Sequence, residues 1–140
     1  EYDSDTSLKF ESYPYSYVTA NSSRYTSELA IFSKFKLINS ATIEFPESSN
    51  NAIFSDVIVK SDTIRVYNLH LQSSGIDPNV EPFDSKQSNR LINRLAATFK
   101  AQQVQSELVA SHISKSPYKV LLCGDFNNTI YSYVYRILKP

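Results

Sequence analysis

The chain carries chemically useful side chains at two positions where a predicted strand ends. Asp125 and Asn127 follow the apolar run 120–122, which is predicted to be core, and His70 lies near the end of the strand-like segment 64–71. A carboxylate, a carboxamide and an imidazole are groups from which binding and catalytic sites are built. Each also has a structural interpretation, because a histidine at a strand end is commonly a hydrogen-bonded structural residue and Gly-Asp-x-Asn is a common turn. The functional interpretation depends on whether the fold brings the three side chains together.

The predicted elements place these side chains at the same edge of a sheet. Residues 64–71 predict a strand, residues 85–114 a helix and residues 119–125 a second strand. A long helical crossover requires the two strands to run parallel. Parallel strands end at the same edge, where ligands of α/β sheets tend to bind. We therefore expect one site that contains the imidazole, the carboxylate and the carboxamide.

Other strand-like segments precede this unit. They comprise residues 15–19, 29–35, 42–45 and 52–60. The short link Ser61-Asp62 between the last of these and residues 64–71 predicts an antiparallel hairpin. Residues 128–140 predict a short helix or turn. This order of elements predicts a chain of the α/β class.

The predicted helix is long and carries an apolar stripe. Asp84 or Ser85 can cap its start, and Pro117 follows its end. Apolar residues recur at a spacing of four in the first half and resume with a phase shift after residues 102–103. The stripe comprises Leu91, Ile92, Leu95, Ala96, Phe99, Val104, Leu108 and Ile113. The phase shift is compatible with one bent helix or with two helices.

The composition fits one globular domain and leaves most classes of function open. Hydrophobic residues make up 41% of the 140 residues, and 14 basic residues balance 14 acidic ones. This balance indicates no general basic field of the kind that nucleic-acid binders use, although a local patch is compatible with it. Cys123 is the single cysteine, so no intrachain disulfide can form, and the redox compartment stays open. No apolar run has the length of a membrane span.

Two scarce residue types carry information. The chain contains no methionine, which predicts that it is a piece of a longer protein, here called the parent protein. It contains only two glycines, and one of them, Gly124, stands beside Asp125. A glycine at this point predicts a backbone requirement, either a positive φ or the close approach of a ligand.

Three segments, residues 30–34, 64–73 and 120–127, resemble the endonuclease/exonuclease/phosphatase superfamily, which contains DNase I, abasic-site endonucleases, inositol polyphosphate phosphatases and neutral sphingomyelinases. The Gly-Asp-Phe-Asn box is the most specific of them, and the His-Leu-Gln-Ser strand supports it. The resemblance covers most of residues 29–135 and is nearest to the uncharacterised bacterial branch. It implies a DNase I-like two-sheet sandwich with flanking helices.

The resemblance also implies a function, that of a phosphoester hydrolase (phosphodiesterase, nuclease or phosphatase) that depends on Mg²⁺ or Mn²⁺. Asp125 would orient and deprotonate the attacking water, and Asn127 would hold the phosphate and the aspartate in register. His70 would donate a hydrogen bond or a proton to the phosphoryl group. Lys34 would bind a phosphate group. The alternative interpretation is that Lys34 is solvated and has no role in the site. The substrate stays open between a nucleic acid, a phospholipid head group and a small phosphoester.

The metal ligand of the superfamily is an early glutamate, and Glu1 is the candidate here. Magnesium is a hard cation that takes oxygen ligands. The spacing from Glu1 to the stretch 13–15 and to the next strand fits this assignment. The alternative is that Glu1 marks an arbitrary end of the chain.

The chain departs from the superfamily pattern in ways that limit what it does alone. Nothing after Asn127 supplies the Asp-His pair that members carry near their end, and Gln102 stands where an arginine is common on the crossover helix. Complete members have roughly 250 residues, so residues 1–140 are expected to be the central portion of one domain with its N- and C-terminal strands missing. We expect this portion to be inactive alone. The alternative function is a catalytically silent binding module or an inactive fragment, and compartment and oligomeric state stay open.

Overall fold

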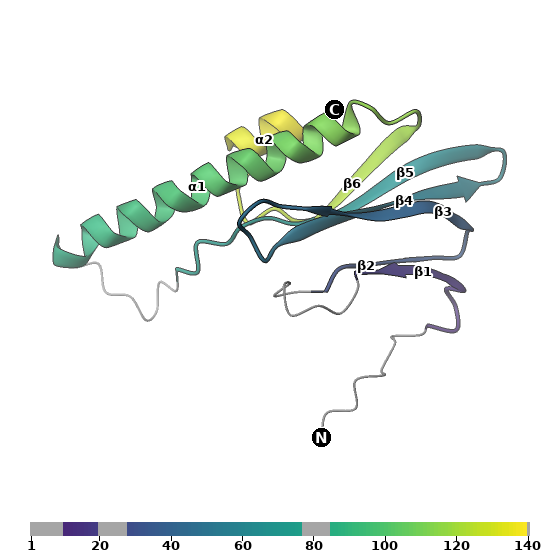
Figure 1. Cartoon of the computed structure of the whole chain (residues 1–140), viewed down its shortest axis with the longest axis horizontal. Coiled ribbons are helices and arrows are strands. Elements are labelled where there is room, and N and C mark those ends of the chain that lie inside the picture. The colour runs from purple at the N-terminus through teal and green to yellow at the C-terminus, as the bar shows by residue number, and fades with distance from the viewer. Residues whose placement is uncertain (1–9, 20–27, 77–84, 140) are drawn as a thin grey trace, which may run out of the picture.

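The computed structural model describes residues 10–19, 28–76 and 85–139 (Figure 1). Within them the element order is β1 (Tyr15–Val18), β2 (Ala30–Ser33), β3 (Leu37–Glu44), β4 (Asn51–Val59), β5 (Asp62–His70), α1 (Ser85–Ile113), β6 (Lys119–Asp125) and α2 (Tyr133–Leu138). The mixed α/β class predicted from the sequence is confirmed. Of the two predicted caps of the long helix, Asp84 lies outside the described residues.

The main sheet has the strand order β3-β4-β5-β6. The first three strands are antiparallel neighbours, and the predicted hairpin is present, with Val59 paired to Asp62 and Lys60 at a φ of 58° in the tight turn. β6 pairs with β5 in parallel, and α1 is the crossover that connects them. The predicted strand–helix–strand unit is therefore confirmed.

Three layers build the described part of the chain. α1 and α2 lie on one face of the main sheet, and the small antiparallel sheet of β1 and β2 lies on the other (Figure 1). Val109 of α1 packs with Leu69 and Leu71 in the core beneath the helices. Ile31 of β2 packs with Ile53 of β4 in the core between the sheets. The expected arrangement of two sheets with flanking helices is thus present.

β3 begins earlier than the sequence indicates. The strand-like run was expected to start at residue 42, but the strand starts at Leu37 and contains a register shift between Ile38 and Ala41. Asn39 has a φ of 50° at this irregularity, and the hydroxyls of Ser40 and Ser55 form a hydrogen bond of 2.7 Å. A β-bulge of this kind interrupts the period of two on which strand prediction rests.

α1 is one continuous helix, but its predicted apolar stripe is not its buried face. Ile92 and Phe99 are 59% and 54% exposed. The buried positions are mostly polar, and they comprise Thr98, Gln102, Gln105, Ser106 and Val109. The first half of α1 extends beyond the edge of the main sheet (Figure 1). No helix among the described residues combines the length and the apolarity needed to cross a membrane.

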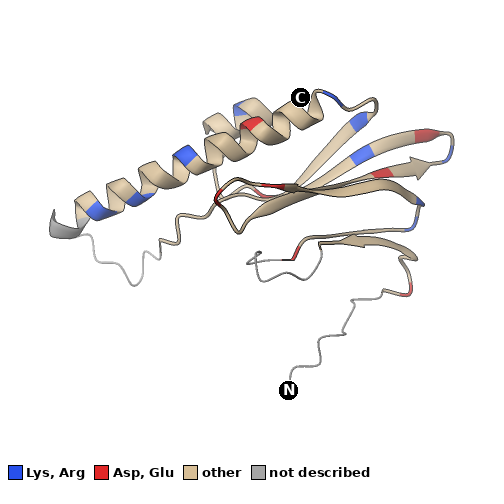
Figure 2. Cartoon of the chain, in the orientation of Figure 1, with Lys and Arg blue, Asp and Glu red and all other residues tan. Residues whose placement is uncertain are grey.

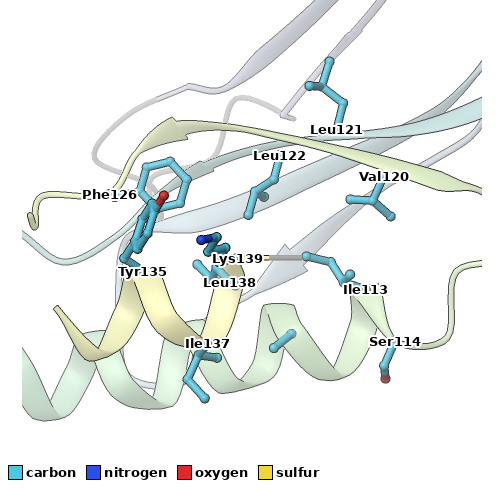
Figure 3. A pocket seen from close by; sticks show the side chains of 11 residues that line it. Ile113, Ser114, Val120, Leu121, Leu122, Phe126, Tyr135, Ile137, Leu138 and Lys139 are labelled. Atoms are coloured by element: carbon cyan, nitrogen blue, oxygen red, sulfur yellow. The ribbon is translucent and has the colours of Figure 1, made fainter. Parts of the chain in front are cut away.

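The apolar run 120–122 of β6 is only partly core, which corrects the sequence-based expectation. Leu121 is 53% exposed and points away from the helices, whereas Leu122 points toward α2 (Figure 3). Val120 and Leu122 line an apolar pocket of about 420 Å³ between β6, α1 and α2. Leu121 is exposed because, among the described elements, the small sheet packs on β3 and β4 rather than on β6.

Candidate functional site

His70 and Asp125 are paired residues at the ends of β5 and β6. The backbone amide of Leu71 donates to the carbonyl oxygen of Asp125 at 2.9 Å, so the two strand ends are held together at their last position. Side chains at paired positions project from the same face of a sheet. Leu69 and Leu71 are buried in the core beneath α1, so His70 between them projects to the opposite face, together with Asp125. The predicted convergence is present.

The carboxylate of Asp125 is exposed and has one defined contact within the turn. Its Oδ1 accepts a hydrogen bond from the backbone amide of Asn127 at 2.9 Å. Asn127 has a φ of 47°, in the left-handed region where asparagine is one of the few residues that fit well. Its side-chain Nδ2 donates to the carbonyl oxygen of Leu71 at 3.0 Å. Asn127 therefore fixes the carboxylate and connects the two strand ends.

The need for glycine at position 124 has a clear structural cause. Gly124 has a φ of 135°, and a Cβ at this position would collide with the backbone of Leu69 on the neighbouring strand. The backbone requirement predicted from the sequence is confirmed. The group that approaches closely is β5 itself, so Gly124 allows β6 to run directly against β5 up to Asp125.

Behind this edge, α1 contributes a buried polar layer that was not predicted from the sequence. Gln102 is fully buried, and its side chain bonds to the backbone of Gln72 after β5 and of Asn127 after β6. Gln105 accepts from the backbone amide of Gln72 at 2.9 Å. The signal in the sequence was the pair Gln102 and Gln105, three residues apart, near the point where the apolar stripe changes phase. Such a pair is one turn apart on a helix and so faces one side.

Lys34 does not join this site. It lies between β2 and Leu37, the first residue of β3. Leu37 pairs with Val57 of β4, and Val57 pairs with Ile64 of β5. Ile64 is near the start of β5, whereas His70 is at its end. The Nζ of Lys34 lies 5.6 Å from the ring centroid of Tyr13, and its side chain is exposed. The phosphate-binding role of Lys34 stays a prediction that its placement does not support.

Glu1 lies outside the described residues, so its role as a metal ligand stays a prediction. Within residues 10–19, 28–76 and 85–139, no group of three or more His, Cys, Asp or Glu side chains is arranged to hold a metal ion. Figure 2 shows that Lys and Arg lie along the first part of α1 and near the start of β5, with Asp and Glu interspersed on the sheet.

A second polar cluster lies away from the strand ends. Arg65 donates to Asp56 through Nε (2.6 Å) and Nη2 (2.8 Å), and both side chains are buried. Burial opposes ionisation of Asp56, but hydrogen bonds from Arg65 and Asn39 outweigh it and lower the pKa of the carboxyl. The hydroxyl of Tyr67 meets Nδ1 of His112 at 2.8 Å. Burial, with the nearby charge of Arg65, lowers the pKa of His112. This cluster joins β4 and β5 to the end of α1 and is structural.

Solved structures share this architecture. A humanized TDP2 from D. rerio matches with a TM-score of 0.58 and 17% identity, over 84% of this chain and 44% of that chain. The beta toxin of Staphylococcus aureus matches with a TM-score of 0.59 and 15% identity, over 91% of this chain and 49% of that one. Sphingomyelinase C from Streptomyces griseocarneus matches with a TM-score of 0.54 and 15% identity, over 78% and 36%.

These likenesses show the fold. It is the DNase I-like fold that the resemblance implied, and the chain spans half or less of the length of each matched structure. No protein-family model matches the chain, and no curated protein matches it.

Proposed function

We propose that this chain, with its DNase I-like fold, supplies the central part of the active site of a metal-dependent phosphoester hydrolase. The observation that carries the proposal is the pairing of His70 with Asp125 at the joined ends of β5 and β6. An imidazole and an exposed carboxylate on one face give a proton donor and a base at neighbouring positions. Because the chain spans half or less of its structural neighbours, the activity is proposed for the parent protein.

Asp125 is the proposed base that orients and deprotonates the attacking water. Its Oδ1 is held by the amide of Asn127, which fixes the direction of the carboxylate before substrate binds. His70, on the same face, is the proposed donor to a phosphoryl oxygen, where negative charge develops. Asn127 is proposed to hold the phosphate and the aspartate in register. Its backbone amide donates to Asp125 and its side chain to the carbonyl oxygen of Leu71, which supports the part of this role that concerns the aspartate.

The chemistry of the donors at this edge fits a hard divalent cation. Carboxylate oxygens are the ligands that Mg²⁺ and Mn²⁺ prefer, and an exposed carboxylate, that of Asp125, lies at the strand end. Glu1 is the proposed ligand, whereas Asp125 stays the proposed base. A bound cation would neutralise charge on the phosphoryl oxygens. One structural neighbour, a mutant of the Staphylococcus aureus beta toxin, contains bound magnesium ions, which supports this proposal.

The substrate is proposed only as a phosphoester. Among the neighbours, sphingomyelinase C is named for a phospholipid substrate, and the human nocturnin catalytic domain holds a sulfate anion, which has the tetrahedral shape of phosphate. A nucleic acid, a phospholipid head group and a small phosphoester all fit the exposed edge at His70 and Asp125. The test is hydrolysis of one representative of each class by the parent protein, with Mg²⁺ and with chelator. No hydrolysis of any of the three with Mg²⁺ would favour a catalytically silent binding module.

A further inference from the structure

We infer that Gln102 is a positioning residue for the site, which ties the turn after β6 to the turn after β5 from the helix behind them. The catalytic part of this inference rests on the proposed function, and its structural part does not. A single side chain that holds both turns couples the two strand ends between which His70 and Asp125 are paired.

The carboxamide of Gln102 is buried, and each of its hydrogen-bonding groups has a partner. Its Nε2 donates to the carbonyl oxygen of Gln72 at 2.6 Å and to the carbonyl oxygen of Asn127 at 3.1 Å. Its Oε1 accepts from Nδ2 of Asn128 at 2.6 Å. A side-chain amide has two donor hydrogens and one acceptor oxygen, and all three have partners here. Burial of an amide is unfavourable without such partners, so the position of the Gln102 amide and the positions of its partners in the two turns depend on each other.

Gln102 is connected to the proposed base, Asp125, through one intervening residue, Asn127. Gln102 holds the carbonyl of Asn127, and the amide of Asn127 donates to Oδ1 of Asp125 at 2.9 Å. Asn127 has a φ of 47°, a left-handed conformation that asparagine tolerates, so the direction of its peptide groups depends on the hydrogen bonds that hold the turn. Without Gln102, the carbonyl of Asn127 loses its partner on the helix. The turn can then relax, and the carboxylate of Asp125 loses its fixed direction.

Two other glutamines of α1 are matched controls. Gln105 is also buried, but it bonds to Gln72 and Ser48 and so holds the turn after β5. Gln103 is exposed and donates to Glu107 on the same helix at 2.9 Å. The three glutamines thus differ in which turns they hold while they share one helix. Replacement by methionine removes the amide and keeps the length of the side chain in each case.

The structural test measures amide hydrogen exchange and the NMR spectrum of the parent protein with Gln102→Met, Gln105→Met or Gln103→Met. Gln102→Met is expected to lower the protection of the Asn127 amide by at least about tenfold, while that of Leu71, within the paired strand ends, changes less. Gln103→Met should change neither, and Gln105→Met should affect Gln72 but not Asn127. Unchanged protection of Asn127 in Gln102→Met would overturn the inference, whether or not the protein has hydrolase activity.

The catalytic test compares kcat and KM for the substrate that the parent protein cleaves best. A misplacement of about 1 Å costs up to about a hundredfold in rate, so Gln102→Met should lower kcat by about ten- to a hundredfold with KM changed less than about threefold. Gln103→Met should leave both parameters unchanged. If Gln102→Met does not fold, Gln102→Asn serves instead, because it keeps a neutral amide and shortens the side chain by one methylene. Full kcat in the folded variant would refute the positioning role.

Discussion

His70 and Asp125 lie side by side at the ends of two parallel strands, and the amide of the next residue, Leu71, closes the pair by donating to the Asp125 carbonyl at 2.9 Å. The pairing places an imidazole and a carboxylate on the face opposite α1, where the side chains are not covered by the helix. Gly124 permits it, since a side chain there would collide with β5. The proposed site thus depends on how closely two backbones approach.

Gly124→Ala is expected to destabilise the protein by at least about 2 kcal/mol, because it adds backbone strain at a φ of 135° to a collision with Leu69. The matched control is Gly75→Ala, where φ is 60° but no atom lies within 4 Å of the added Cβ. That control should cost only about 1 kcal/mol. Urea denaturation of both variants measures the difference. Equal losses would show that the contact between β5 and β6 is not as close as described.

Arg65→Met is expected to lower the free energy of unfolding by about 3–5 kcal/mol, because it leaves the buried carboxylate of Asp56 without its charged partner. Lys119→Met breaks an exposed pair with Asp62 at 3.8 Å and should cost less than about 1 kcal/mol. Chemical denaturation near neutral pH compares the two variants. Similar small losses would argue that the Asp56 carboxylate is solvated rather than buried.

The stability of the protein should fall as the pH drops from about 7 toward 5, and His112 should cause part of this fall. Its pKa is lowered in the folded state by burial, by Arg65 and by Lys115, and is partly restored by Asp56. The unfolded chain therefore binds the proton first, below its ordinary pKa of about 6.5, and stability is lost as the pH falls from there through the folded pKa. His112→Gln should flatten the dependence, as followed by unfolding at several pH values. An unchanged slope in His112→Gln would contradict the assignment.

Hydrolysis of a phosphodiester by the parent protein is expected to vanish with chelator and to return with Mg²⁺ or Mn²⁺. If Glu1 is a ligand, Glu1→Gln should raise the metal concentration for half-maximal activity by at least about tenfold, by analogy with the effect of altered metal-site partners. Glu11→Gln changes an exposed acid and serves as the control. Activity that survives exhaustive chelation would exclude the proposed use of a metal.

The sequence was sufficient to predict the paired strand ends, because a helical crossover leaves little choice in the direction of the strands it joins. It was not sufficient for the helix between them. The face of α1 that packs on the sheet carries Gln102 and Gln105, and the spacing of this pair indicates a shared face but not that the face is buried. Its apolar residues, such as Phe99, indicated the wrong face: Phe99 is 54% exposed, although Thr98 beside it is buried.

The placement of Lys34 could not be predicted for a different reason. The chemistry of a lysine beside a strand is the same at either end of a sheet, and the direction of the strands decides which end it occupies. β3 is antiparallel to β4 and β4 to β5, so the start of β3 lies level with the start of β5. Lys34, which precedes β3, therefore lies near the start of β5, away from His70. Leu121 is a similar case, because among the described elements the small sheet covers β3 and β4 rather than β6.

The most direct test of the proposed function is Asp125→Asn in the parent protein, with kcat and the unfolding midpoint measured on one preparation. Asparagine keeps the size of the side chain and an oxygen that can accept from the Asn127 amide, but it cannot take a proton from water. We expect kcat to fall by at least about a hundredfold, with stability unchanged or slightly increased. Asparagine forms turns nearly as well as aspartate. A stable and fully active Asp125→Asn protein would show that Asp125 only shapes the turn and would refute its role as the base.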